Sequence, residues 1–162
     1  MAKLLIALSP LFLLFTCSLK HKPDAKIVRY EYSIHGSMAQ PIHQFTVEKI
    51  NDKTCRLSYF NHDREFDSWD SMHDKDGNFV LDTYKEPIAL LDSIQQIFVE
   101  HKMWTYKKNY QPTLQVLDGN SWSLNITLDD GTSYSSSGYH SKPKDDGIDV
   151  IINMLKRKFN GI

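Results

Sequence analysis

Histidines are the residues of this chain best suited to metal chemistry. The sequence contains seven of them, and no two have the four-residue spacing with which a helix holds zinc. A metal site would need distant loops to bring together pairs such as His62-Asp63 and His73-Asp74. Histidines in turns and on the surface explain the pattern more simply. The sequence therefore predicts no metal site.

Hydroxyl and carboxyl groups are the other candidates for catalysis. Ser135-Ser136-Ser137 lie close to His140, but the G-x-S-x-G turn that exposes a nucleophilic serine is missing. The acid pairs Asp129-Asp130 and Asp145-Asp146 are next to or near glycine, where carboxylates accept hydrogen bonds at turns and helix starts. The sequence contains no glycine-rich phosphate loop. These patterns predict no catalytic residue and no cofactor.

Aromatic side chains are the better candidates for binding a partner. We favour the core for most of them, and we select Trp69, Trp104, Tyr106 and Tyr110 as a candidate surface for a partner. Exposed rings stack on sugars or form hot spots for proteins, and residues 104–110 also carry two lysines. The hypothesis fails if Trp104 and Tyr110 are both more than about nine-tenths buried.

The first sixteen residues have the composition of an export signal. Lys3 precedes an apolar run from residue 4 to residue 15, and Cys17 follows where polar sequence begins. This run is too short to span a bilayer, which takes about 20 apolar residues. We expect residues 1–16 to be removed after export. A cut a few residues later, with Cys17 playing no special part, is the alternative.

The segment Leu14-Phe15-Thr16-Cys17 resembles a bacterial lipobox. The resemblance implies that fatty acyl chains, such as palmitate, are attached to the thiol of Cys17 and to the new amino terminus. Phe15 and Thr16 are larger than the residues usual at their places in the motif. Ser18 in place of aspartate implies the outer membrane, by the rule of some Gram-negative families. Each buried CH₂ contributes about 0.8 kcal/mol, so several chains hold a protein on the membrane.

Composition indicates one globular domain over residues 26–162, with residues 17–25 as the lipidated cysteine and tether. Hydrophobic residues make up 41% of the chain, charged residues 24%, and the net charge is −1. The basic residues are dispersed and form no stripe that could follow phosphates, so we predict no nucleic-acid partner. Cys55 lies in a segment in which apolar and polar side chains alternate, and we expect it to be a small buried hydrophobic residue. A disulfide bond between Cys55 and Cys17 is possible only if Cys17 carries no lipid.

Hydrophobic periodicity predicts strands and two helices. Alternating residues predict strands near 28–34, 42–50, 55–59, 79–81, 114–117, 122–128 and 132–138, with a tight turn at Asp129-Asp130-Gly131. Pro87 suits the first position of a helix that ends near residues 100–102. A second helix follows Asp145-Asp146 and ends with a basic turn. Residues 103–110 give no clear prediction. The fold class is α+β, with an antiparallel sheet of hairpins and both amphipathic helices on one face.

The carboxy-terminal third resembles the ending of small uncharacterised bacterial exported proteins. Those chains share W-x-L-x-I-x-aromatic-x-D-G, a glycine, a proline and a helix, matched here by Trp122 to Gly131, Gly138 and Pro143. Leu128 replaces the aromatic residue. The group is a domain of unknown function, so the resemblance implies a hairpin and helix and no catalytic residues.

Together these patterns predict a membrane-tethered lipoprotein of the cell envelope. We expect a non-enzymatic domain that binds a protein, a peptide or a glycan; an inhibitor or immunity-type role is a variant of this. The alternative is a small envelope hydrolase or metal-dependent enzyme with a site assembled from distant loops. An enzyme requires a pocket in which titratable groups converge, whereas a binding module requires an exposed patch or an open sheet face.

Overall fold

The computed structural model describes residues 22–36, 41–61, 73, 75–76, 79–113 and 119–159. Cys17, Trp69 and the strand expected at 114–117 lie outside these residues. The elements, in chain order, are β1 (Ile27–His35), β2 (Pro41–Lys49), β3 (Thr54–Asn61), β4 (Asp82–Pro87), α1 (Ala89–Glu100), the 3-10 helix η2 (Met103–Thr105), β5 (Asn109–Tyr110), β6 (Ser121–Leu128), β7 (Ser133–Tyr139) and α2 (Gly147–Phe159). A mostly antiparallel sheet with two α-helices confirms the α+β class.

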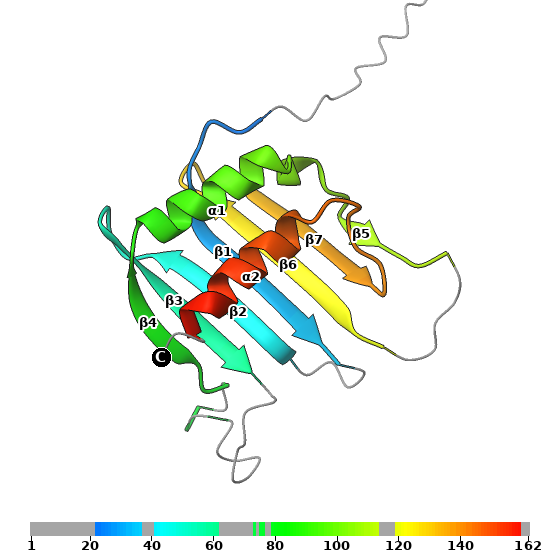
Figure 1. Ribbon diagram of the computed structural model, residues 1–162, viewed down its shortest axis with the longest axis horizontal. Helices are drawn as coiled ribbons and strands as arrows, with labels where there is room; N and C mark the ends of the chain where they lie inside the picture. The colour runs from blue at the N-terminus through cyan, green and yellow to red at the C-terminus, as the bar shows by residue number, and fades with distance from the viewer. Residues whose placement is uncertain are drawn as a thin grey trace, which may run out of the picture.

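The seven strands form one sheet in the order β4-β3-β2-β1-β6-β7-β5 (Figure 1). The first four strands follow one another as a meander. The chain then passes through α1 and returns on the other side of β1, where β6 pairs antiparallel with β1 and β7 pairs antiparallel with β6. β5 alone is parallel to its neighbour, and it pairs only with Ser137 and Gly138 of β7. The sheet therefore consists of a four-stranded half and a hairpin half that share β1.

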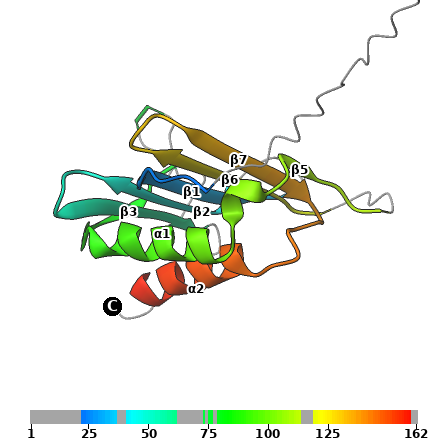
Figure 2. The same cartoon turned by 90° about the horizontal axis from the view of Figure 1, so that it is seen from above.

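The core takes alternate residues of the central strands, as period-two patterning predicts. Tyr30 and Tyr32 of β1 are fully buried. Side chains from the strands and from both helices join them in one cluster, which includes Phe45, Val47, Leu57, Ile94, Phe98, Leu124, Ile126, Ile151 and Leu155. In the view of Figure 2, α1 and α2 are drawn beneath the strands of the sheet. The sheet face away from this cluster, on which Arg29 and Glu31 lie, is called the outer face below.

Cys55 behaves as the sequence predicts of a small buried hydrophobe. Its side chain is inaccessible and it forms no disulfide in the described part of the chain. Burial raises the pKa of its thiol above the ordinary value, so the nucleophilic thiolate is disfavoured. The thiol donates a hydrogen bond to the carbonyl of Pro87.

The start of α1 differs from the prediction. Pro87 is the last residue of β4 rather than the first of the helix, because the chain stays paired with β3 up to Thr54 opposite Pro87. The amide of Ile88 then donates to the carbonyl of Lys53, and the helix begins at Ala89. Strand pairing therefore keeps Pro87 extended, a conformation that its fixed φ also permits.

The start of α2 and the turn between β6 and β7 follow the prediction. Asp146 takes the N-cap position, where its carbonyl accepts from the amide of Val150, and the carboxylate of Asp145 provides the side-chain cap by accepting from the amide of Gly147, 3.1 Å away. Gly131 has a φ of 84°, in the left-handed region that a tight hairpin turn needs. The neighbouring carboxylate of Asp130 accepts from the amide of Thr132 at 2.8 Å. Both elements are specified by short-range sequence.

None of the described helices is both long and apolar enough to cross a membrane.

Candidate functional site

The aromatic residues selected from the sequence are mostly in the interior. Trp104 and Tyr106 are each only 8% exposed, and the ring of Trp104 lies 5.7 Å from that of Phe98. Tyr110 is half-buried and packs 5.9 Å from the ring of Trp122. Among these three residues, Tyr110 is the one that is not buried. Trp104 and Tyr106 thus serve mainly as core residues and leave little surface for a partner.

A polar cluster explains why Tyr106 faces inward. Its hydroxyl donates to the carboxylate of Asp145, the residue that caps α2. Burial and this neighbouring carboxylate both raise the pKa of Tyr106 far above the ordinary value. The Nδ1 atom of His101, just after α1, lies 3.6 Å from Asp145 and 3.5 Å from Asp146. These contacts join the end of α1 to the start of α2, which is a structural role.

The serines near His140 do not form a catalytic pair with it through their hydroxyls. Ser135 donates to the side-chain oxygen of Asn125, whereas Ser136 and Ser137 donate to the backbone carbonyls of Lys107 and Lys108. Within the described ranges, no group of three or more His, Cys, Asp or Glu side chains is placed to hold a metal ion.

A different serine and histidine meet on the outer face. The hydroxyl of Ser33 lies 2.8 Å from Nε2 of His35 and 2.7 Å from the hydroxyl of Ser123. Ser33 is only 5% exposed, and it lies in the central strand β1, whose backbone groups pair with β2 and β6. A nucleophile needs access to substrate and amide donors for the oxyanion. The Ser33–His35 contact is therefore better explained as a structural hydrogen bond within β1, next to the cross-strand bond from Ser33 to Ser123.

The two halves of the outer face differ in chemistry. On the four-stranded half, Arg29 forms ion pairs with Glu31 at 2.9 Å and with Glu48 at 3.0 Å. On the hairpin half, six adjacent positions of β6 and β7 carry small uncharged side chains, which are Ser123, Asn125, Thr127, Ser133, Ser135 and Ser137. We call these six residues the hairpin face. Together with Lys108, part of this face lines a shallow depression of about 400 Å³.

A second concavity lies at the outer edge of β7. It has a volume of about 280 Å³ and separates η2 from the first half of β7. Its lining is mostly apolar, with Met103, Trp104, Leu124 and Ile126, and it also includes Lys108 and residues 133–136. We call this cavity the edge slot. Trp104 and Tyr106 thus contribute to a concave site, but as its walls and not as an exposed aromatic platform.

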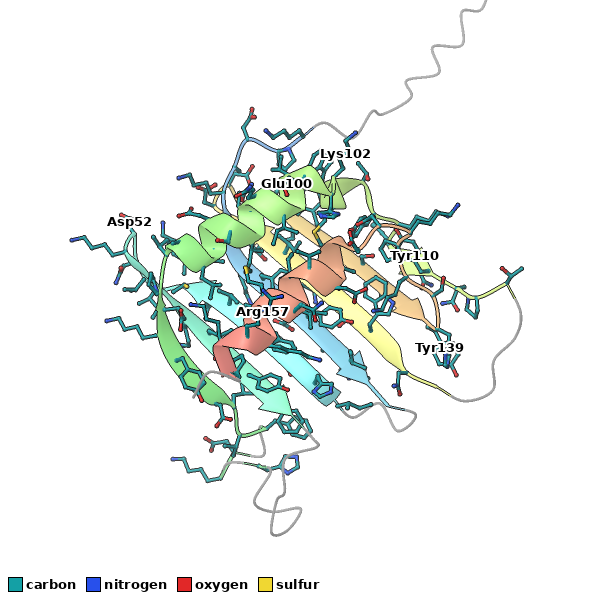
Figure 3. All side chains as sticks on the ribbon, in the orientation of Figure 1. Asp52, Glu100, Lys102, Tyr110, Tyr139 and Arg157 are labelled. Carbon is teal, nitrogen blue, oxygen red and sulfur yellow. The ribbon has the colours of Figure 1, made fainter. Side chains whose placement is uncertain are left out.

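The segment beside the edge slot is basic. Lys102, Lys107 and Lys108 are all exposed, and residues 101–113 contain no acidic side chain. Figure 3 shows Lys102 at the end of α1 and Tyr110 on β5, on the two sides of η2 in the chain. This end of the hairpin is therefore positively charged.

Sequence reasoning missed the edge slot and the hairpin face. The signal for the hairpin face was present, because Ser123, Asn125 and Thr127 alternate with the apolar residues of their strand and Ser133, Ser135 and Ser137 have the same period. The slot had no such signal. The slot is present because β5 pairs with only the last part of β7. A strand of two residues leaves no pattern in the sequence from which this pairing could be predicted.

Comparison with known proteins adds no relative to these observations. No family model matches the chain, and no curated protein matches its sequence.

Proposed function

We propose that this protein is a lipid-anchored binding protein of the bacterial cell envelope, tethered through Cys17, and that its domain binds a protein or peptide partner at the hairpin half of the sheet. The export signal and the lipobox resemblance support the location. Part of the proposal is that both helices pack on one face and leave the outer face open. The side view in Figure 2 and the burial of alternate strand residues support this arrangement.

The observation that carries the proposal is the run of six small uncharged side chains on the hairpin face. Covering serine, threonine and asparagine costs less desolvation and less side-chain entropy than covering charged residues. Their hydroxyls and amides can also adapt to a partner's hydrogen bonds, as they do in antibody loops. A partner that covered the half built around Arg29 would have to desolvate long charged side chains, which form ion pairs there.

The buried aromatic rings favour a protein or peptide over a glycan. Sugar sites commonly stack a pyranose ring on an accessible tryptophan or tyrosine. Trp104 and Trp122 are 8% and 5% exposed, so neither offers such a surface. Backbone and side-chain hydrogen bonding at the hairpin suits recognition of a polypeptide.

Site-specific photo-crosslinking in the native host tests the binding surface. A benzoylphenylalanine at Asn125 places the probe on the hairpin face, and the same probe at Arg56 places it on the exposed four-stranded half. We expect an adduct of discrete mass from Asn125 and none from Arg56. Equal crosslinking from the two positions, or no adduct from Asn125, would contradict the proposal.

Intact mass of the membrane fraction tests the anchor. Wild type is expected to begin at Cys17 with added acyl mass, whereas Cys17→Ser is expected to keep its leader, because no thiol is present to acylate. A mature wild-type chain that begins after Cys17 without lipid would remove the tether. It would also favour a secreted enzyme over an anchored binding protein.

A further inference from the structure

We propose that the edge slot binds an extended, acidic peptide segment, which joins the sheet as an added strand beside Ser133 and Ser135 of β7. One apolar side chain of this segment enters the slot, and an acidic side chain lies near Lys108. The inference rests on the proposed function in that it names the partner class and the mode of binding at the same hairpin.

Backbone geometry provides the first argument. In an antiparallel pair, alternate residues direct their N–H and C=O groups away from the partner strand. Leu128 donates to Thr132 at the start of the hairpin, and the amide of Ser137 turns outward to the carbonyl of Lys108, 3.0 Å away. By the same alternation, Ser133 and Ser135 direct their backbone groups outward. No backbone hydrogen bond from the rest of the described chain reaches these two residues on that side.

The opposite edge of the sheet, formed by β4, carries residues that oppose the addition of another strand. β4 carries Lys85, Glu86 and Pro87, and charges and proline are the usual means of blocking strand addition. The free part of β7 has the sequence Ser-Tyr-Ser over residues 133–135, with neither charge nor proline. Of the two edges, the free part of β7 is the one that carries neither charge nor proline to oppose the addition of an extended chain.

The edge slot supplies what strand addition needs for specificity. Peptides bound in this way use backbone hydrogen bonds for affinity and pockets for alternate side chains. Leu124 and Ile126 line the slot from the sheet, and Met103 and Trp104 line it from η2. Its volume of about 280 Å³ accommodates one aliphatic or aromatic side chain.

Charge sets the composition and the direction of the peptide. Lys107 and Lys108 lie where β5 approaches the hairpin, whereas Asp129 and Asp130 lie at the hairpin turn. An acidic side chain is therefore attracted at the β5 end and repelled at the turn. The complementary segment carries its acidic residue on the side of Lys108 and its apolar residue next to it in the slot.

Selection of linear peptides tests the proposal. The probe is a phage-displayed library of random nonapeptides, selected on the full-length protein. We expect enriched sequences with an acidic residue near an apolar one, and we expect the enriched peptide to slow amide exchange at Ser133 and Ser135. Absence of enrichment, or a bound peptide that leaves these two amides unchanged, would overturn the inference.

Matched variants at one residue separate the edge from the face. Ser135→Pro removes the outward N–H without removing a bond to β6, and Ser135→Ala removes only the hydroxyl. We expect Ser135→Pro to weaken binding of the peptide at least ~10-fold, or ~1.4 kcal/mol, and Ser135→Ala, which keeps the outward N–H, to weaken it clearly less than Ser135→Pro does. Lys108→Glu should weaken it about fivefold. Equal affinities of the proline variant and wild type would overturn strand addition.

The outcomes for the two proposals can be told apart. If Asn125 still crosslinks while Ser135→Pro leaves the affinity for the peptide unchanged, the proposed binding surface is supported and strand addition is contradicted. If Ser135→Pro does not fold, shown by its circular dichroism, the exchange of the Ser133 and Ser135 amides in wild type decides the question.

Discussion

The two halves of the sheet's outer face share one strand but satisfy their polar groups with different kinds of side chain. Around Arg29, long charged side chains pair with one another at 2.9 Å and 3.0 Å. Across β1, the hairpin face carries only short uncharged side chains, and the neighbouring edge at Ser133 and Ser135 ends without a backbone partner in the described chain. The comparison shows that one half of a sheet face can satisfy its polar groups with ion pairs, and the other half with hydrogen bonds between short uncharged side chains such as Ser135 and Asn125.

The largest expected effect comes from the tight packing that holds the hairpin half together. A Cβ at Gly138 would lie 2.2 Å from the carbonyl oxygen of Ser141 and 2.5 Å from Nε1 of Trp122. We expect Gly138→Ala to lower the free energy of unfolding by about 3 kcal/mol, because the backbone must shift. Urea unfolding measures this change. Gly131→Asn, at an open turn position that tolerates a left-handed residue, is the control and should change it by less than about 1 kcal/mol.

The polar cluster behind the edge slot gives the next largest effect. Asp145→Ala removes the cap of α2 and leaves the hydroxyl of Tyr106 without its carboxylate partner. We expect a loss of about 2 kcal/mol in unfolding free energy, from the cap and the unpaired hydroxyl together. Thermal unfolding checks this loss. Asp145→Asn, which keeps a side-chain oxygen for the amide of Gly147 and the hydroxyl of Tyr106, is the matched control, and a loss as large for this variant would contradict the assigned contacts.

The shared strand β1 gives a smaller effect that depends on pH. The hydroxyls of Tyr30 and Tyr32 are buried without a hydrogen-bond partner in the described residues, and burial raises the pKa of both. Because the folded pKa values exceed the unfolded value of about 10, stability is fully present below pH 10 and falls as the pH rises above it.

Replacing one of these tyrosines isolates its part of this pH dependence. Tyr32→Phe should raise the unfolding free energy at neutral pH by about 1 kcal/mol, since it removes a buried hydroxyl that lacks a partner. It should also make the alkaline decline less steep. Denaturant unfolding from pH 7 to pH 11 measures both, and an unchanged alkaline slope in this variant would contradict the assignment.

The smallest expected effect is on the charged half. Arg29 is partly exposed, with 43% of its side-chain surface accessible, so its ion pairs are screened by water. Arg29→Ala should therefore lower the unfolding free energy by about 0.5 kcal/mol, and less at high salt. The same variant should leave peptide binding at the edge slot unchanged. A clear loss of that binding would show that the two halves of the face are not independent.

Local sequence predicted the parts of the fold that depend on near neighbours. The cap at Asp145 and the turn at Gly131 appear as expected, since each is specified within a few residues. Pro87 did not start a helix, because its pairing with β3 depends on residues far back in the chain. Trp104 was assigned to an exposed surface from an irregular segment, but long-range packing against Phe98 buries it. The hydrophobic periodicity of the sequence carries no information about such long-range contacts.

By itself, the sequence determined the alternation of the strands, the apolar faces of the helices, the turn chemistry and the predicted export signal, because each depends on residue types at short spacing. Only the tertiary structure decided that β6 returns beside β1, that β5 pairs with just Ser137 and Gly138, and that an edge slot remains beside β7. The physical reason is that strand order and edge exposure depend on which distant segments bury one another. Hydrophobic pattern states that a face is buried, but not what covers it.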